Sequence, residues 1–194
     1  GTTWSVTFNG NTKSSTGTSI QFYVTYGTYS WSTSTLTFSK YGTRFVPSPS
    51  SGSFFVPSTT SQKISFTTQY YLTMYANPSG DGTVSPSSAW YNAYSTVSIS
   101  ASPNSGYEFV NWTGYNLTPY GAQQGYLAVG AYSGTSESAS VTMNNPIIEV
   151  ANFKLITYTV TFTESGLPSG TTWNVTFNGN TKSSTGTSIS FVVT

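Results

Sequence analysis

Short runs in which apolar and polar residues alternate recur along most of the chain. Every second residue is apolar in 4–8, and the same alternation occurs in 96–101, 158–163 and 173–177. Successive side chains point to opposite faces of a β-strand, so this period of two predicts strands with one buried face. Gly, Pro, Asn and Ser separate the runs, as in Asn77-Pro-Ser-Gly-Asp-Gly82, and these residues favour turns. The pattern predicts an all-β chain.

A segment of 25 residues occurs twice, in 1–25 and 170–194, at an offset of 169 residues. Only three pairs of positions differ: Ser5 and Asn174, Gln21 and Ser190, Tyr23 and Val192. All three pairs lie on the polar side of the alternation, whereas the apolar side is identical in both copies. The repeat therefore predicts two copies of one structural unit whose apolar face packs a core.

The repeat also suggests three modules. Residues 1–68 are expected to form a small antiparallel β-sandwich of Ig-like type, residues 69–156 a second β-rich module, and residues 157–194 a partial Ig-like module. The junctions at 67–70 and 153–157 contain neither Gly nor Pro. Flexible linkers are rich in such residues, so nearly continuous strands and a stiff rod are expected instead.

The second copy is preceded by a strand-like stretch, 158–163, that has no counterpart before Gly1. We therefore expect the first module to lack its opening strand, and strand completion, along a tandem array or between subunits, to be central to function. The residues assigned to the completing segment are Tyr158, Val160, Phe162, Trp173, Val175 and Phe177.

Charged residues make up 6% of the chain, compared with about 25% in an average soluble domain. The net charge is +1 and the six cationic residues are scattered, so no nucleic-acid partner is expected, because phosphate binding needs clustered Lys and Arg. No apolar stretch approaches the roughly 20 residues of a membrane-spanning helix. This segment is therefore expected to contain no membrane span.

Catalytic chemistry has few candidate residues. Cys and His are absent and only five carboxylates occur, which excludes thiol catalysis and Cys-ligated zinc. Glu108 and Glu149 lie in predicted strands and are interpreted as solvent-facing. We expect no catalytic, metal-binding or cofactor-binding residue and predict that the protein is not an enzyme. Because acid unfolding requires carboxylates to be protonated or buried His to be charged, we also expect an acid-stable fold.

Residues 72–153 resemble the divergent InlB-type B-repeat of bacterial and archaeal surface proteins. The matching residues are Leu72, 77–86, 91–93, 95–97, 101–107, Phe109, Trp112, 141–146 and 151–153. The resemblance implies a small β-rich module of adhesins and surface arrays. Two departures stand out: Tyr94 occupies a position where the family usually has Gly, and residues 115–133 form an apparent insertion.

The remaining modules are similar to repeats of archaeal surface proteins and of proteins related to thermopsin-type secreted proteases. The residues that carry this similarity are 163–170, Trp173, Asn178-Gly179 and 26–30. The resemblance implies an Ig-like accessory module from a thermoacidophilic archaeon.

Two kinds of surface site are candidates. Asn111, Asn116 and Asn174 begin Asn-x-Thr sequons and are candidate N-glycosylation sites of a secreted glycoprotein. An aromatic contact surface, for glycans or for neighbouring subunits, is assigned to Tyr71, Trp90, Tyr91 and Tyr94. The alternative interpretation of these aromatic residues is packing within and between modules.

Two functions remain open. The first is a structural repeat of an extracellular filament, stalk or adhesin shaft, assembled by tandem repeats, by strand complementation between subunits, or by both. Its partners would be copies of itself, with surface glycans as further candidates. The second is a carbohydrate-binding or accessory module of a secreted archaeal hydrolase. Both place the protein outside the cell or on its surface.

Overall fold

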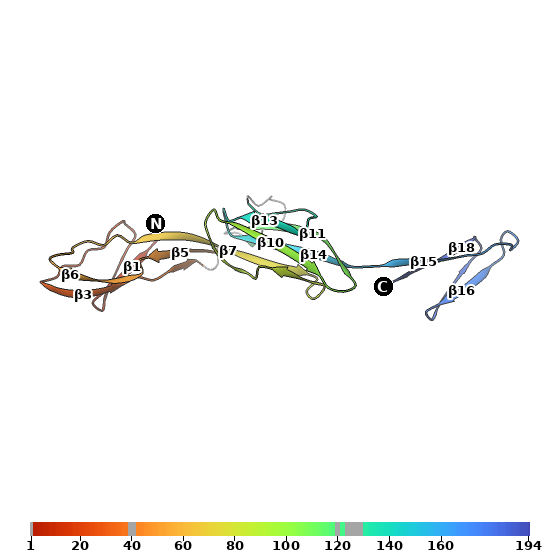
Figure 1. Cartoon of the computed structure of the whole chain (residues 1–194), viewed down its shortest axis with the longest axis horizontal. Coiled ribbons are helices and arrows are strands. Elements are labelled where there is room, and N and C mark those ends of the chain that lie inside the picture. The colour runs from red at the N-terminus through yellow and green to blue at the C-terminus, as the bar shows by residue number, and fades with distance from the viewer. Residues whose placement is uncertain (1, 39–41, 119–120, 123–129) are drawn as a thin grey trace.

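The structure is a computed structural model in which residues 2–38, 42–118, 121–122 and 130–194 are described. All regular elements in these residues are β-strands, which confirms the predicted all-β class. The strands form three bodies in a row, with the last and smallest at the C-terminal end (Figure 1).

The first module has two sheets. One is four-stranded, in the order β2-β1-β3-β6, and the other contains β4, β5 and the first part of β7. The strand bounds are β1 (Trp4–Phe8), β2 (Asn11–Ser15), β3 (Gly27–Ser32), β4 (Leu36–Phe38), β5 (Thr43–Ser48), β6 (Ser51–Val56) and β7 (Ser65–Asn77).

The apolar face of β1 lies in the core of this module, as the alternation predicts. Val6 and Phe8 are buried together with Trp31 of β3, and half-buried aromatic residues, including Tyr29 and Phe54, pack against them. The ring of Phe8 stacks on that of Tyr29, with the centroids 5.3 Å apart. The core is small and largely aromatic, because few aliphatic residues are available in this module.

The second module packs a three-stranded sheet, β13-β10-β8, against a larger sheet that contains β12, β11, β14, β7 and β9. The additional strands are β8 (Gly82–Ser85), β9 (Ala89–Asn92), β10 (Thr96–Pro103), β11 (Tyr107–Thr118), β12 (Gly121–Ala122), β13 (Ser138–Thr142) and β14 (Ile147–Leu155). β14 pairs antiparallel with β11 and parallel with β7. The fully buried side chains at the centre include Leu72, Trp112 and Met143.

The third body consists of two separate strand pairs, β15 with β18 and β16 with β17. Their bounds are β15 (Tyr158–Thr163), β16 (Trp173–Phe177), β17 (Asn180–Ser184) and β18 (Ser188–Val193). It follows β14 after only two residues, Ile156 and Thr157.

β7 belongs to both the first and the second module. Its residues from Ser65 to Tyr70 pair with β5, and those from Leu72 to Asn77 pair with β14. The boundary expected between residues 68 and 69 falls inside this 13-residue strand. The two modules are therefore joined by an uninterrupted strand.

Candidate functional site

The two copies of the repeat fold into the same local structure. β1 pairs with β2 and β16 pairs with β17 in identical registers. The indole N–H of Trp4 donates a hydrogen bond to the carbonyl oxygen of Gly17 at 2.8 Å, and that of Trp173 donates to Gly186 at 2.6 Å. These bonds fix the chain at the exit of each hairpin.

A lysine holds the segment that follows each hairpin. Nζ of Lys13 donates to the backbone oxygen of Gln21 at 2.8 Å, and Nζ of Lys182 donates to that of Ser190 at 2.7 Å. Each ammonium group also lies 5.0 Å from the centroid of a phenylalanine ring in the same segment. The segment is thus held against its hairpin in the same way in both copies.

In the second copy this segment is the strand β18. It pairs with β15 over six residue pairs, from Tyr158 opposite Val193 to Thr163 opposite Ser188. On the outer face, the hydroxyls of Thr161 and Ser190 share a hydrogen bond of 2.8 Å. β15 therefore supplies a complete strand partner to the repeated segment.

In the first copy, 19–25 is not a strand and has no strand partner among the described residues. The consequence appears in the burial of identical side chains. Ile189 and Phe191 are 4% and 5% exposed, whereas their equivalents Ile20 and Phe22 are only half-buried. The same sequence is therefore buried where β15 is present and left open where it is not.

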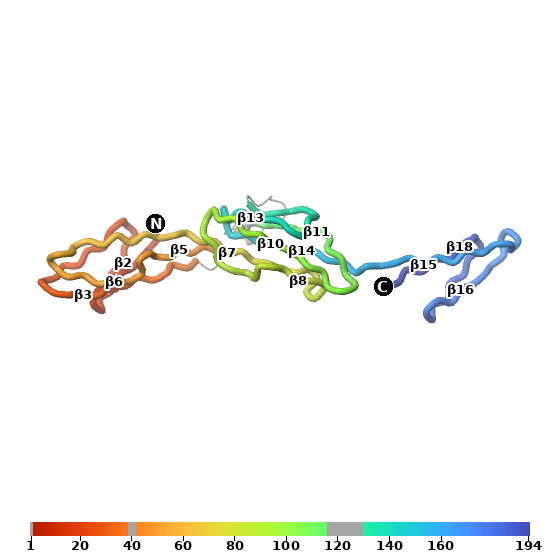
Figure 2. The backbone as a smooth tube through the Cα atoms, in the orientation of Figure 1, coloured from red at the N-terminus to blue at the C-terminus, as the bar shows by residue number. Residues whose placement is uncertain are grey.

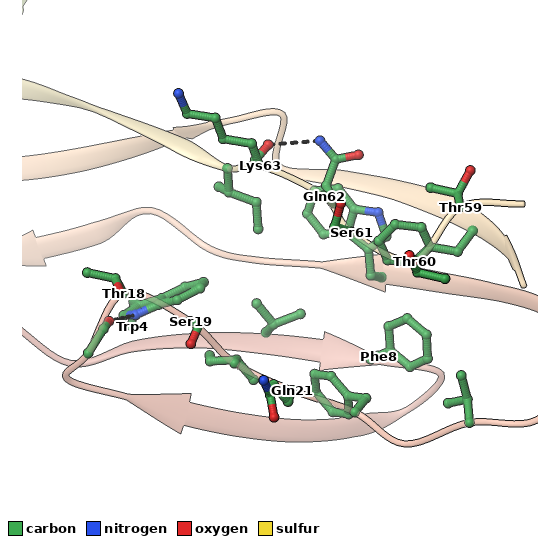
Figure 3. Close-up of a pocket in the computed structure, with 18 of the residues that line it drawn as sticks. Trp4, Phe8, Thr18, Ser19, Gln21, Thr59, Thr60, Ser61, Gln62 and Lys63 are labelled. Atoms are coloured by element: carbon green, nitrogen blue, oxygen red, sulfur yellow. Dashed lines mark hydrogen bonds between the residues drawn. The ribbon is translucent and has the colours of Figure 1, made fainter. Parts of the chain in front are cut away.

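An apolar groove lies along this open segment. Its volume is about 1080 Å³, and its walls include Val6, Phe8, Ile20, Phe22 and Phe54. The opposite wall includes 59–64, which is also outside any strand. Figure 3 shows the labelled residues from Thr59 to Lys63 across the opening from Ser19 and Gln21. The groove runs between two chain segments that both lack a strand partner among the described residues.

The structure places the predicted completing residues in two groups. Val160 and Phe162 lie on β15 and are half-buried. The ring centroid of Phe162 lies 5.7 Å from that of Phe177 and 6.0 Å from that of Phe191. Tyr158 is 63% exposed.

The other three residues of the predicted set, Trp173, Val175 and Phe177, lie on β16. This strand belongs to the β16–β17 hairpin, which does not pair with β15 and contacts it through the rings of Phe177 and Phe162. Of the two groups, only the residues of β15 lie on the strand that pairs with β18.

The aromatic contact surface is divided between packed and exposed residues. The rings of Tyr71 and Trp90 meet edge to face at 5.1 Å, and the Arg44 guanidinium lies 4.7 Å from the centroid of the Trp90 ring. Tyr91 packs on the core of the second module. Tyr94 is 77% exposed and is the most exposed of these four residues.

Two of the sequon asparagines have described side chains. Oδ1 of Asn111 accepts a hydrogen bond from Asn152 at 2.8 Å, and Asn152 in turn accepts one from Asn77 at 2.9 Å. Asn111 is thus the end of an amide ladder across three strands, whereas Asn174 is exposed on β16. The side chain of Asn116 lies outside the described part of the structure.

The expectation that Glu149 faces solvent is wrong. Glu149 is 0% exposed, and its Oε1 accepts a hydrogen bond of 2.7 Å from the backbone N–H of Tyr132. Its Oε2 has no hydrogen-bond partner in the described part of the chain, and burial raises the pKa of the carboxyl from its ordinary value of 4.5 to about 7. The alternation of residues along β14 could have indicated that Glu149 is buried, since Ile147, Glu149 and Ala151 share one face of the strand.

Among the described residues, no group of three or more Asp and Glu side chains is placed to hold a metal ion. The described part of the chain also contains no helix long and apolar enough to cross a membrane.

Comparisons with known proteins agree with the resemblance of the second module. No curated protein and no solved structure matches the chain. Residues 72–157 match the family model of the divergent InlB B-repeat domain. These residues contain the end of β7, from Leu72 to Asn77, and all strands from β8 to β14, which form the middle body of the chain (Figure 2). The central module is therefore similar to the divergent InlB B-repeat domain, a repeat module of surface-protein type.

Proposed function

We propose that the chain is a non-enzymatic structural repeat of an extracellular filament, stalk or adhesin shaft. Its role is mechanical: modules are joined end to end by strands and completed by strands from neighbouring repeats, neighbouring subunits, or both. The proposal also includes three properties of the protein: stability in acid, an archaeal origin, and glycosylation at Asn174 and the other sequons. The B-repeat match of residues 72–157 supports a surface location.

The observation that carries the proposal is the continuity of β7 through two modules. At Gln69 and Tyr70 this strand pairs with β5 of the first module and also with β9 of the second. The two modules therefore overlap along one strand instead of meeting at a linker. Bending such a joint requires ladder hydrogen bonds to break, so a rigid connection is expected.

Side chains reinforce this overlap. Nε of Arg44 on β5 donates a hydrogen bond of 2.7 Å to Oε1 of Gln69, and Nε2 of Gln69 donates one of 2.8 Å to Asn92 on β9. The Arg44 guanidinium also lies over the ring of Trp90 on β9. We call Arg44, Gln69, Trp90 and Asn92 the joint cluster. It connects β5, β7 and β9, and thus both modules.

The second junction is similarly short. β14 ends at Leu155 and β15 begins at Tyr158. Between them, the backbone N–H of Ile156 donates a hydrogen bond of 2.8 Å to the carbonyl oxygen of Gly106. The chain leaving the second module is therefore tied to that module up to the start of the next strand.

The alternative of a carbohydrate-binding module receives less support. Sugar platforms need an aromatic face open to solvent, and Arg44 occupies one face of Trp90 while Tyr71 packs on its ring. Of the four residues assigned to the aromatic contact surface, only Tyr94 is exposed. The contacts of Trp90 within the joint cluster explain the role of this residue, so no glycan is needed to explain it.

Chains that contain one, two and three units of 169 residues test the proposal. Negative-stain microscopy and small-angle scattering would measure their lengths. A stiff shaft predicts rods that lengthen by the same increment with each added unit, whereas compact particles or flexibly linked beads would contradict it. Antibody labelling of intact source cells would test the surface location independently.

A further inference from the structure

We propose that segment 130–137 is a pH-sensitive strap, which the protonated carboxyl of Glu149 keeps closed on the second module and which is released when this carboxyl ionises. We call 130–137 the strap. It leads directly into β13, so the whole device lies within the second module and goes beyond the proposed shaft function.

Hydrogen bonds attach the strap to the edge of β11 that faces away from β14. The backbone N–H of Trp112 donates to the carbonyl oxygen of Gly134 at 2.8 Å, and the N–H of Gly134 donates back to Trp112 at 3.3 Å. The backbone N–H of Gly114 donates to Oγ of Ser133 at 3.1 Å. The strap therefore supplies partners to backbone groups that β14 does not pair.

The strap also packs on the core of the second module. Ala131 and Tyr132 are half-buried against the core cluster that contains Trp112. The indole N–H of Trp112 donates a hydrogen bond of 3.3 Å to the backbone oxygen of Glu137. Release of the strap would thus remove apolar contacts from the core and the partner of this indole.

Glu149 lies directly against the strap. It is opposite Gly114 on β11 and Met74 on β7, and its Oε1 accepts the hydrogen bond of 2.7 Å from the backbone N–H of Tyr132. A Cβ on Gly114 would lie 2.6 Å from the carbonyl oxygen of Tyr132 and 2.8 Å from Oε1 of Glu149, so this close approach requires glycine. Displacement of the strap would let water reach the carboxyl while β7, β14 and β11 stay paired.

In the described part of the chain, no positive charge faces the carboxyl of Glu149. Glu108 of β11 and Lys154 of β14 are exposed and form an ion pair with each other, 3.1 Å apart, and Glu137 is exposed. β7, β10 and β13 contain no charged residue. The other titratable side chains on β7, β11 and the strap are tyrosines, which supply no positive charge: Tyr70, Tyr71, Tyr75, Tyr107, Tyr115 and Tyr132.

Ionisation of Glu149 therefore opposes closure of the strap. Its Oε2 has no hydrogen-bond partner among the described residues, and a buried charge without a partner is costly. Burial raises the pKa of this carboxyl from 4.5 to about 7 in the closed form, whereas water restores the ordinary value once the strap opens. The closed form is fully favoured below pH 4.5, and this advantage is lost as the pH rises through about 7.

Hydrogen exchange followed by NMR tests this opening in the full chain. The reporters are four backbone N–H groups that bond between the strap and its neighbours: those of Trp112, Gly114, Tyr132 and Gly134. Their protection factors, which are corrected for the intrinsic effect of pH on exchange, should fall on the order of 100-fold from pH 4 to pH 8. The same amides should be less protected than those of β10, because the strap opens while the sheets stay folded.

Two variants and one distant hairpin are the controls. Glu149→Gln should keep the four protection factors within about twofold between pH 4 and pH 8, because an amide does not titrate. Ser133→Ala removes the bond to Gly114 but leaves Glu149 in place, so it should lower protection by the same factor at both pH values. Amides of the β16–β17 hairpin, which pairs with no strand of the second module, should show no dependence on pH.

Constant protection of the four strap amides in the natural chain from pH 4 to pH 8 would overturn the inference. So would equal protection of the strap and β10 amides, since the strap would then open only with the whole module. The same pH dependence in Glu149→Gln as in the natural chain would also overturn it, because another group would be responsible. None of these outcomes affects the rod lengths measured for tandem chains.

Discussion

Phe22 and Phe191 occupy equivalent positions in the two copies of the repeat, yet only Phe191 is buried, with 5% of its surface exposed. Their hairpins, their lysine contacts and their neighbouring apolar residues match. At the segment itself, the two copies differ in the strand β15, which pairs with the segment that contains Phe191. The chain thus contains an open and a completed version of one strand edge.

A peptide with the sequence of residues 157–169 is expected to stabilise the first module. Any ligand that binds only the folded state raises the free energy of unfolding, by about 2.7 kcal/mol at a concentration of 100 times Kd. Thermal melts of the full chain with increasing peptide would measure the effect. The same peptide with Phe162→Asp should produce no shift, because burying a charge in an apolar groove lined by Phe8 and Phe22 is too costly. Equal shifts from both peptides would contradict a specific groove.

The buried carboxyl of Glu149 is expected to make the protein more stable in acid than at neutral pH. Its folded pKa of about 7 lies above the ordinary value of 4.5, so the folded state keeps a proton that the unfolded state releases. The resulting stability is fully present below pH 4.5 and is lost as the pH rises through about 7. The loss is on the order of 3 kcal/mol.

Glu149→Gln provides the matched test. The amide keeps the shape and can still accept the hydrogen bond from Tyr132, but it does not titrate. Urea unfolding from pH 4 to pH 8 should show a falling stability for the natural chain and a nearly flat profile for the variant. A natural chain whose stability rises over this range would contradict the assignment.

The joint cluster is expected to show favourable energetic coupling between Arg44 and Trp90. A double-mutant cycle with Arg44→Ala and Trp90→Ala should give about 0.5–1 kcal/mol, the range for a cation–π contact that is not fully buried. Arg44→Lys should recover little of it, because the planar guanidinium and its Nε donor are lost. The exposed ion pair of Lys154 and Glu108, 3.1 Å apart, is a control pair that should show negligible coupling. Zero coupling between Arg44 and Trp90 would contradict the hypothesis that the joint cluster stiffens the junction between the two modules.

Tyr94 is expected to destabilise the second module through its backbone conformation. Its φ of 65° lies in the left-handed region, which costs a residue with a Cβ roughly 1–2 kcal/mol. Tyr94→Gly should therefore raise the melting temperature, although the gain is reduced by the greater freedom of Gly in the unfolded chain. Tyr94→Ala, which removes the ring but keeps the Cβ, should not. A larger gain from Ala than from Gly would show that the exposed ring, not the backbone, is the source of strain.

Much of the fold could be predicted from the sequence because the alternation is local. The period of two located β1, β15 and β16, and the repeat identified which faces are apolar. The same period placed Glu149 on a buried face, but its charge favoured the opposite interpretation. A protonated carboxyl is neutral and can lie on the buried face of the strand. Its protonation depends on the surroundings of Glu149, which form only when the chain folds.

The features that were not predictable depend on pairing between distant segments. The apolar alternation of Ile20, Phe22 and Val24 predicts a strand, but a strand forms only where a partner lies beside it. Likewise, nothing in the local sequence of Arg44 or Trp90 indicates that β5 and β9 flank one strand. The absence of Gly and Pro at the junction predicted continuity, whereas the overlap of two modules along β7 required the structure.

Hydrogen exchange at the two copies of the repeat tests the central claim most directly, because their peptides differ in sequence and can be followed separately in one sample. At high dilution, amides of 188–193 should be protected and those of 19–25 should exchange rapidly. Adding a peptide with the sequence of residues 157–169 should protect 19–25 progressively, since this peptide contains the β15 sequence that pairs with 188–193. Strong and equal protection of both segments without peptide would contradict an open edge, and exposure of 19–25 that persists at saturating peptide would contradict completion of this segment by the β15 sequence.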